Sequence, residues 1–583
     1  MQEPAPTFRR IRLITIFMCV VGAIFIVRLF YIQVVKNDYY EAEALKEHTA
    51  KFAVPASRGE IYARDGPDKI VPLVLNEPTY TVFADPRGVK DATKVADVMR
   101  RIAGGNVVAH FEEGLKNKER QYTVLARQIN KQQADLIKKE NLAGVGLQAA
   151  EKRVYLEGSL AAQVLGFVNG EGKGQYGIEQ ALNDELAGKP GQLKAVTDVN
   201  GVPISIGQQS VQTPAENGKS LVLSIDRTVQ SYTEAALKAG LERVKATRGS
   251  VIVMNPNNGH ILAMANAPTF EPAKYDTVTD YVVFQNRVVN DAYEPGSVIK
   301  PFTMAVGLNE GVIQPDTTYT NTGSTQVADA TIKNVSNDVT GRTTMTQVLR
   351  FSLNTGVVHV LRLLGGSDDV NAKAKETLYK YFGERFFFGE PTGVPLGEAA
   401  GDLIAPDDPQ GGPVRYANMT FGQGLTMTMI QAASTFSAMV NGGTYYSPQL
   451  ISGYRAADGT VAPKQPSIRK SDVLSAQTSE KLRQMIHDTR ADSNVSRNDK
   501  KGYFIGGKSG TAQVYDPATG KYSETNTIGS YIGFGGQQKA EYVIMVRVDD
   551  ARIGEFAGSA AAAPIFGDIS SWLLDYLKIQ PKA

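Results

Sequence analysis

Three short motifs in the second half of the chain carry groups that could do acyl-transfer chemistry. They are Ser297-Val-Ile-Lys300, Ser352-Leu-Asn354 and Lys508-Ser-Gly510, in this order. A serine hydroxyl is a poor nucleophile until a neighbouring group takes its proton, and residues three apart on a helix face the same side. Each motif alone also fits an ordinary helix cap, helix end or surface strand. The ordered set predicts a nucleophilic serine that is activated by a lysine.

Other nucleophile systems have little support in this sequence. The chain has five histidines, and none of them lies in a G-x-S-x-G turn or another recognisable Ser-His setting. The single cysteine, Cys19, lies in an apolar run near the N-terminus. A Ser-Lys pair is a known variant of the Ser-His-Asp triad, in which a lysine takes the proton of the serine. We therefore expect Ser297 at the N-terminus of a helix with an apolar stretch over 299–308, where the helix end also stabilises developing negative charge.

The second and third motifs supply groups for proton transfer and substrate binding. Ser352 and Asn354 follow a helical pattern over 345–351, so we expect them in a loop. From there the serine could relay protons and the amide could hold a substrate carbonyl. Lys508 opens a predicted strand that ends at Tyr515. A strand with a lysine and hydroxyls suits a peptide carboxylate laid along a sheet edge, and Gly510 would let a substrate backbone approach closely.

A rival interpretation of the third motif is a phosphate-binding loop. Gly502 to Ser509 matches the pattern G-x-x-x-x-G-K-[ST], and the run 542–549 could be the strand with an acidic end that such ATPases use. A phosphate loop must open a helix. The residues 511–515 are extended in character and turn at Asp516-Pro517, so we reject a nucleotide site here.

The N-terminus predicts a membrane anchor. The run 13–35 is nearly all apolar and carries no charge except that of Arg28, and it is long enough to cross a bilayer when that side chain reaches outward. Arginines at 9, 10 and 12 precede it, which places the tail 1–12 in the cytoplasm and the rest of the chain outside. A cleaved signal peptide is the alternative, but no small-x-small cleavage site follows the run. With Cys19 alone, the exported part has no disulfide.

Composition and periodicity predict a soluble body of two domains after the anchor. The net charge of +2 and the 21% of charged residues give no nucleic-acid signature. A linker-like stretch divides a mixed pedestal, 36–213, from a second domain, 214–583. Pedestal helices are predicted at 38–51, 92–102 and 131–139; the second domain has predicted strands at 220–225, 249–254, 260–265, 508–515, 528–535 and 542–548, a helix from 226 to about 244, a helical middle section and a final helix at 564–577. This segregation predicts an α+β fold, with an antiparallel sheet flanked by helices and a helical subdomain.

The chain resembles the class B penicillin-binding proteins, the monofunctional peptidoglycan transpeptidases, over almost its whole length. Besides the three motifs, the resemblance rests on the landmarks Arg28 to Gln33, Arg58-Gly59, Arg64-Asp65-Gly66, Leu165-Gly166-Phe167, Gly177-Ile178-Glu179, Tyr293-Glu294-Pro295-Gly296, Gly393, Gly397-Glu398, Phe421-Gly422-Gln423-Gly424 and Asn441-Gly442-Gly443. Two departures are mild: Ser509 replaces a commoner threonine, and Glu271 stands where a related Phe-Asp-Pro has aspartate.

The resemblance implies a reaction and a role for each site residue. Ser297 would attack the D-alanyl-D-alanine end of a peptidoglycan stem peptide, and an amine of a second strand would resolve the acyl-enzyme. Lys300 would be the base, Ser352 the proton relay, Asn354 the group that positions the substrate amide, and Lys508 the source of local positive potential. Ser509, Gly510 and Thr511 would bind the substrate, with its terminal carboxylate on the two hydroxyls. The backbone N–H groups of Ser297 and Thr511 would form the oxyanion hole. No metal or organic cofactor is implied.

The implied partners are stem peptides, β-lactams bound covalently at Ser297, a glycan polymerase of the SEDS family in the membrane, and other proteins of a division or elongation complex. The short cytoplasmic tail and the segment 79–86 favour the division (septal) type over the elongation type. Two other classes stay open. A β-lactamase would need a base that activates a deacylating water, and a penicillin sensor would need a signalling domain across the membrane, where only the twelve residues Met1 to Arg12 precede the anchor.

Overall fold

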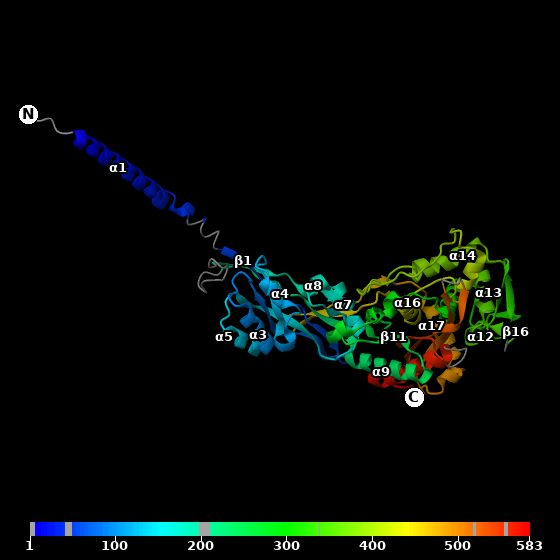
Figure 1. The fold of residues 1–583 in the computed structure, drawn as a ribbon. Helices are drawn as coiled ribbons and strands as arrows, with labels where there is room; N and C mark the ends of the chain where they lie inside the picture. The colour runs from blue at the N-terminus through cyan, green and yellow to red at the C-terminus, as the bar shows by residue number, and fades with distance from the viewer. Residues whose placement is uncertain are drawn as a thin grey trace, which may run out of the picture. The chain divides into compact units, whose positions relative to one another are not determined.

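The computed structural model describes residues 6–40, 43, 49–196, 210–336, 339–516, 521–552 and 558–582. The chain forms two compact units. The first holds Met1–Ser57, Pro78–Lys152 and Gly188–Asn217, and the second holds Arg58–Glu77, Arg153–Ala187 and Gly218–Ala583. All three motifs lie in the second unit, together with two segments from before the predicted linker (Figure 1).

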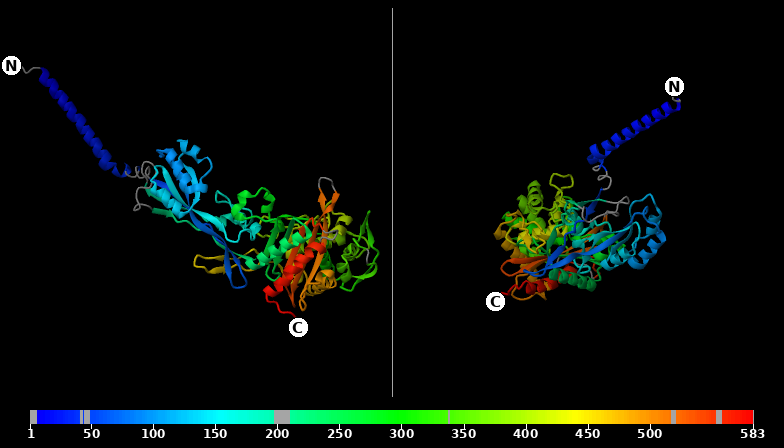
Figure 2. Two further views of the ribbon diagram at one scale, coloured as in Figure 1. Left: turned by 60° about the horizontal axis from the view of Figure 1, so that its bottom comes forward. Right: turned by 90° about the vertical axis from the view of Figure 1, so that its left-hand side faces the viewer.

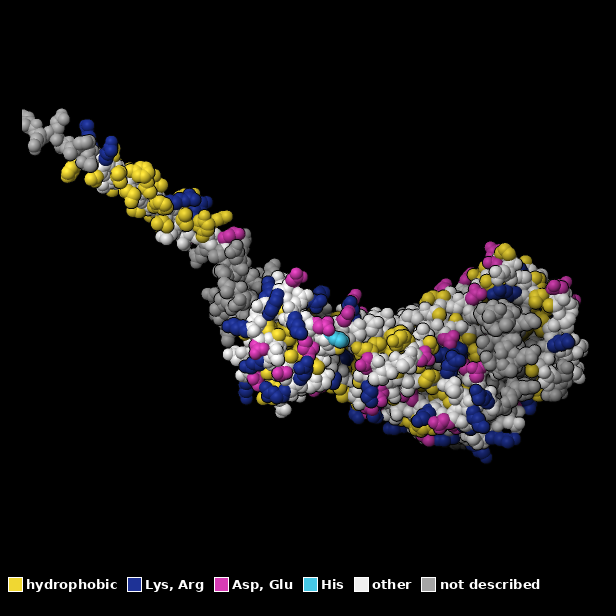
Figure 3. All heavy atoms as spheres, viewed as in Figure 1, with side chains coloured by type: hydrophobic (Ala, Val, Ile, Leu, Met, Phe, Trp, Pro, Cys, Tyr) yellow, Lys and Arg dark blue, Asp and Glu magenta, His cyan; other side chains and the backbone are white. Residues whose placement is uncertain are grey.

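The N-terminal apolar run forms one helix in the first unit. Helix α1 spans Pro6–Phe30 and continues as a short π-helical turn, η1, at Tyr31–Val35. The 28-residue stretch Phe8–Val35 is long and apolar enough to cross a membrane, and none of its apolar window is buried. Hydrophobic side chains cover the helix, with basic side chains at its N-terminal end and again toward its C-terminal end (Figure 3). These features are those expected of a membrane anchor.

The rest of the first unit combines a three-stranded sheet and strands of a larger, seven-stranded sheet with short helices. Strands β1 (Thr49–Val54), β8 (Gly191–Val196) and β9 (Ser210–Thr213) form one sheet. Helices α3 (Ala92–Ala103), α4 (Phe111–Lys116) and α5 (Lys131–Lys139) pack with β4 (Thr123–Ile129), β5 (Val145–Tyr155) and the second half of β3 (Ile70–Ala84). The predicted helices at 92–102 and 131–139 are confirmed, and the side chains of Asp91 and Asn130 cap their first turns.

The predicted helix at 38–51 is wrong at its C-terminal end. Strand β1 begins at Thr49 and pairs antiparallel with β8, because the alternating run Thr-Ala-Lys-Phe-Ala-Val finds a partner strand far along the chain. Residues 37–40 are helical, while 41, 42 and 44–48 lie outside the described residues.

The second unit is built around a five-stranded antiparallel sheet. The strand order is β12 (Ile261–Ala267), β11 (Arg248–Met254), β23 (Ala540–Asp549), β22 (Lys521–Gly536) and β21 (Gly506–Asp516). These are the predicted strands, including the hairpin at Asn257-Asn258-Gly259. Strand β21, which carries Lys508, therefore forms an edge of the sheet, where it can receive an extended peptide.

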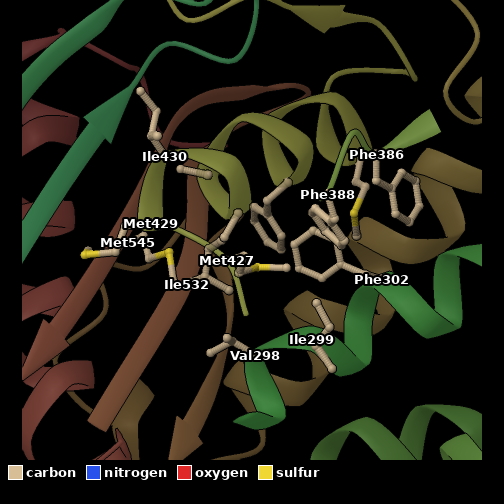
Figure 4. Packing of buried hydrophobic residues seen from close by; sticks show 14 of the residues in the cluster. Val298, Ile299, Phe302, Phe386, Phe388, Met427, Met429, Ile430, Ile532 and Met545 are labelled. Atoms are coloured by element: carbon tan, nitrogen blue, oxygen red, sulfur yellow. The ribbon is translucent and has the colours of Figure 1, made fainter. Parts of the chain in front are cut away.

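Helices cover both faces of this sheet. Helices α9 (Arg227–Val244) and α18 (Ala563–Tyr576) lie side by side on one face, against Tyr531, Ile544 and Val546 (Figures 1 and 2). On the other face α11 (Lys300–Asn309), α16 (Met429–Val440) and α17 (Ala476–Ala491) pack on Ile532 and Met545. Figure 4 shows Phe302 of α11 in this core, beside Phe386 and Phe388. The α+β prediction is confirmed.

The helical subdomain also contains a hairpin and a second strand pair around it, neither of which the sequence predicted. Its helices are α12 (Met345–Arg350), α13 (Asn354–Gly365) and α14 (Ala372–Tyr379). Strand β13 (Thr318–Asn321) pairs with β16 (Gly341–Thr344), and β14 (Ser324–Val327) pairs with β15 (Ala330–Lys333). These four-residue strands are mostly polar and each buries a single residue, so they carry no hydrophobic alternation that could reveal them.

A second sheet corrects one further expectation. The predicted strand at 220–225 forms as β10 (Ser220–Asp226), but it lies outside the five-stranded sheet. It pairs parallel with β2 (Ile61–Arg64) and antiparallel with β18 (Ile451–Arg455). The remaining α-helices and β-strands among the described residues are α6 (Ala162–Leu165), β6 (Phe167–Val168), β7 (Gly174–Gln175), α7 (Gly177–Ala181), α8 (Asn183–Ala187), α10 (Arg287–Asn290), α15 (Pro413–Met419), β17 (Tyr445–Tyr446), β19 (Val461–Pro463) and β20 (Ile468–Lys470).

Candidate active site

The first motif lies where a short 3-10 turn, η5 (Gly296–Ile299), runs into helix α11. The α-helix begins at Lys300 rather than at Ser297, because Pro301 suits the first helical turn. Side chains three apart eclipse one another on a 3-10 helix. Ser297 and Lys300 therefore still share one side of the turn. The side chain of Ser297 is half-buried, and its hydroxyl has no hydrogen-bond partner within the described ranges.

Lys300 is a fully buried lysine, and its amine contacts the second motif. Its Nζ donates to the carbonyl of Ser352 and, at 3.0 Å, to the hydroxyl oxygen of Ser352. Burial, and to a smaller extent the nearby charge of Lys508, holds the pKa of Lys300 well below its ordinary value. A neutral amine has two hydrogens for the two Ser352 oxygens and keeps a free lone pair. Lys300 can therefore accept a proton from a neighbouring hydroxyl.

The backbone of Ser352 presents both of these oxygens to the lysine. Ser352 connects α12 to α13 in a left-handed conformation, with φ 55°, which is uncommon for a residue other than glycine. Its N–H donates to the carbonyl of Leu349 at 3.3 Å. A strained backbone at the contact point of two polar motifs is typical of functional positions.

The sequence suggested a loop position for Asn354, but this residue begins helix α13. Its Nδ2 donates at 2.9 Å to the carbonyl of Lys333, at the end of strand β15. The next residue is held by the same region, because Thr355 donates its N–H to the side-chain oxygen of Asn334 at 3.0 Å. The unpredicted hairpin thus sets the orientation of the Asn354 amide.

Lys508 is almost completely buried on the edge strand β21. Burial lowers the pKa of Lys508 to about 8, and its Nζ donates to the carbonyl of Ser509 at 2.8 Å. Side chains alternate along a strand, so Ser509, which pairs with Tyr531, points to the opposite sheet face from Lys508. The hydroxyl of Thr511 accepts a hydrogen bond from the N–H of Gly558 at 3.2 Å.

Gly510 permits the nucleophile turn to pack on β21. A Cβ at this position would lie 2.9 Å from the nitrogen of Val298 and 3.0 Å from the carbonyl oxygen of Pro295. A Cβ on Gly296 would in turn lie 2.9 Å from the carbonyl oxygen of Thr511. Glycine at these two positions therefore lets the nucleophile turn and strand β21 pack closely together, in addition to the approach of a substrate backbone that the sequence suggested for Gly510.

The fold thus brings Ser297, Lys300 and Ser352 together beside strand β21, which carries Lys508, Gly510 and Thr511. Lys508 and Ser509 lie within a strand and open no helix, which is incompatible with a phosphate loop. Over the described residues, no group of three or more His, Cys, Asp or Glu side chains could hold a metal ion.

A glycine-rich loop around Gly422 holds the nucleophile turn from its other side. The N–H of Gly296 donates to the carbonyl of Gly422 at 3.1 Å, and a Cβ on Gly422, where φ is 89°, would lie 2.1 Å from the carbonyl oxygen of Gly296. Glu294 accepts from the N–H of Gly424 at 2.8 Å. In the sequence these residues are landmarks of the family resemblance, with no role assigned to them. Their glycines were the only sequence signal of this close packing.

Known proteins resemble this chain over almost its whole length. The family described as the penicillin binding protein transpeptidase domain matches residues 249–571, and the penicillin-binding protein dimerisation domain matches residues 53–223. Stage V sporulation protein D of Bacillus subtilis (strain 168) is 32% identical over 98% of this chain and 86% of its own length. Peptidoglycan D,D-transpeptidase FtsI of Escherichia coli (strain K12) is 28% identical over 95% of this chain and 90% of its own length.

Solved structures share the fold. Penicillin binding protein 3 of Mycobacterium tuberculosis, in a crystal structure with aztreonam, has a TM-score of 0.67 at 24% identity and covers 91% of this chain and 98% of its own. The chain belongs to the penicillin-binding protein family, in its class B, with a dimerisation domain before the transpeptidase domain.

Proposed function

We propose that this protein is a serine-type peptidoglycan D,D-transpeptidase with Ser297 as its nucleophile. The observation that carries the proposal is the buried, hydrogen-bonded Lys300 one 3-10 turn after that serine, with its pKa held low. Relatives named peptidoglycan D,D-transpeptidase support the same reaction.

The proposed reaction has two acyl-transfer steps. In the first, neutral Lys300 takes the proton of Ser297 while Oγ attacks the carbonyl of the penultimate D-alanine. The proton passes through Ser352 to the leaving nitrogen, and the terminal D-alanine departs as a free amino acid. In the second, an amine of another stem peptide attacks the ester, gives up a proton along the same route, and releases the Ser297 hydroxyl. Asn354 holds the substrate amide during both steps.

Binding of the substrate uses the edge strand. Protonated Lys508 supplies positive potential for the terminal carboxylate through the edge strand, without having to contact it. Ser509 and Thr511, which point to the opposite face of that strand from Lys508, donate hydroxyl hydrogen bonds to the carboxylate. Because the turn at Gly296 packs on the backbone of Thr511, the N–H groups of Ser297 and Thr511 are suited to form the oxyanion hole. No residue of the machinery requires a cofactor.

A penicillin burst experiment tests this function against the β-lactamase alternative. The described site contributes two lysines and hydroxyls near Ser297, and no carboxylate there hydrogen-bonds Lys300, Ser352 or Lys508. We therefore expect one hydrolysed or bound penicillin per chain, followed by a nearly flat line, far below the turnover of about 1–10³ per second that ordinary enzymes reach. Sustained release of hydrolysed penicillin over many equivalents would contradict the proposal.

Two further proposals concern the chain's organisation in the cell. We place the domains at 1–12 (cytoplasmic tail), 13–35 (anchor), 36–213 (pedestal) and 214–583 (transpeptidase), with everything after the anchor outside the cytoplasm; the run of arginines before the apolar helix supports this orientation. We also propose the division (septal) role, beside a SEDS-family polymerase and other division proteins, with elongation as the alternative.

A membrane-impermeant fluorescent penicillin tests orientation and role together. Cells that make this chain, in place of their own enzyme, are expected to be labelled without lysis and with the signal at the division site. Cells with Ser297→Ala serve as the control for labelling of other proteins. Labelling that appears only after lysis would overturn the orientation, and a signal spread along the side wall would favour the elongation role.

A further inference from the structure

A cluster of buried charges lies on the strand next but one to β21. Arg547 and Asp549, both on β23, form an ion pair with Nε to Oδ1 at 2.8 Å. Their side chains are only 4% and 8% exposed. Arg287 of helix α10 donates to the other oxygen of Asp549. Asp291 accepts a hydrogen bond from Arg287 Nε at 2.9 Å and lies 3.2 Å from Arg547 Nη2. The rival ATPase interpretation had singled out Asp549, and the structure gives that carboxylate this different setting.

The cluster holds the segment that leads into the nucleophile turn. The Arg547 guanidinium lies over the ring of Tyr293, 4.2 Å from its centre. The hydroxyl of Tyr293 bonds to that of Ser530 at 3.0 Å, and Ser530 lies opposite both Gly510 and Arg547 in the sheet. Tyr293 is four residues before Ser297, and Gly510 belongs to the third motif. One network therefore joins the approach to the serine with the strands beside the substrate edge.

We propose that Arg547, with Asp549 and Tyr293, is a positioning group that sets the place of Ser297 relative to Lys508 and Thr511. Buried ion pairs add little stability compared with apolar residues of similar volume, while removal of one partner is costly. A planar guanidinium stacked on a ring and bonded to two carboxylates fixes geometry in a way that an ammonium does not. The cluster is therefore better suited to hold a position than to add stability.

The consequence is a specific kinetic signature. Small displacements of a reacting group from its productive geometry can cost about 10²-fold in rate. A shift of the Tyr293 to Ser297 segment would slow acylation itself, since Lys508 and the substrate edge of β21 remain in place. The maximal acylation rate should fall while the half-saturating penicillin concentration changes little.

The test compares two matched buried clusters in the same unit. The second cluster is Arg58–Glu179–Arg153, in which Arg153 Nε bonds to Glu179 at 2.8 Å and both side chains are 6% exposed or less. The hydrogen bonds of its two arginines to Asn76, Asn183 and Glu179 involve no residue of the three motifs. In both Arg547→Met and Arg153→Met one arginine still pairs with the buried carboxylate. The two variants should therefore lose comparable stability in thermal unfolding.

We expect Arg547→Met to lower the maximal acylation rate by about ten- to a hundredfold, and Arg153→Met to leave it unchanged. Arg547→Lys should restore folding stability better than the rate. If Arg547→Met does not fold, Tyr293→Phe, which removes only the bond to Ser530, should still lower the rate several-fold. Equal acylation by wild type and folded Arg547→Met or Tyr293→Phe would overturn the inference, as would equal losses in Arg547→Met and Arg153→Met.

The inference rests on the proposed acylation of Ser297, but the two can fail separately. If the wild-type protein forms no penicilloyl adduct, the proposed function itself is wrong. If wild type reacts and the variants react equally well, only the positioning role is lost.

Discussion

Lys300→Ala is expected to slow the acylation of Ser297 by about 10²–10⁴-fold, the usual contribution of a positioned general base. Nζ of Lys300 is buried and, among the described residues, bonded only to oxygens of Ser352, so its loss removes the amine that contacts the proton relay. Stopped-flow measurement with a chromogenic β-lactam gives the rate. Lys375→Ala is the control: its Nζ donates to the carbonyls of Pro406 and Gly411, both at 2.9 Å, so its loss should affect folding stability without affecting acylation.

The pH dependence gives this prediction a second readout. Lys300 acts as a base only when neutral. Because its pKa is lowered, acylation should rise with pH and reach its maximum well below the ordinary lysine range. Lys508 attracts the substrate carboxylate only when charged, so the rate should fall again above pH of about 8. Lys508→Arg keeps its charge and should remove the falling limb, while Lys300→Ala should remove the rising limb. Near-normal rates in Lys300→Ala would exclude Lys300 as the base.

The strands of the main sheet and the placement of Ser297 and Lys300 on one side of a helical turn could be predicted, because their sequence signals are local. The spacing of Ser297 and Lys300 survives the change from α-helix to 3-10 turn, since both geometries put residues three apart on one side. The helix start was misplaced because Pro301 acts on the residues around it more strongly than the apolar periodicity does.

The supports of the site could not be predicted because they come from distant parts of the chain. The Asn354 amide is held by a carbonyl at Lys333, and a backbone acceptor leaves no trace in the sequence. Arg547 and Asp549 alternate with apolar residues in a strand, where they look like solvent-facing positions until the fold buries them against Tyr293. The same limit applies to β1, whose partner β8 lies far along the chain.

Intact mass of the protein after incubation with penicillin tests the central claim most directly. Ser297 has a half-buried, unbonded hydroxyl on the turn that leads into Lys300, and no other serine among the described residues shares that arrangement with two buried lysines. The account predicts one penicilloyl group per wild-type chain, located on Ser297 by peptide mapping. It predicts none on the Ser297→Ala variant, provided that this variant is folded and has the same thermal unfolding temperature as the wild type. A penicilloyl group on folded Ser297→Ala, or one mapped to Ser352 or Ser509 in the wild type, would contradict it.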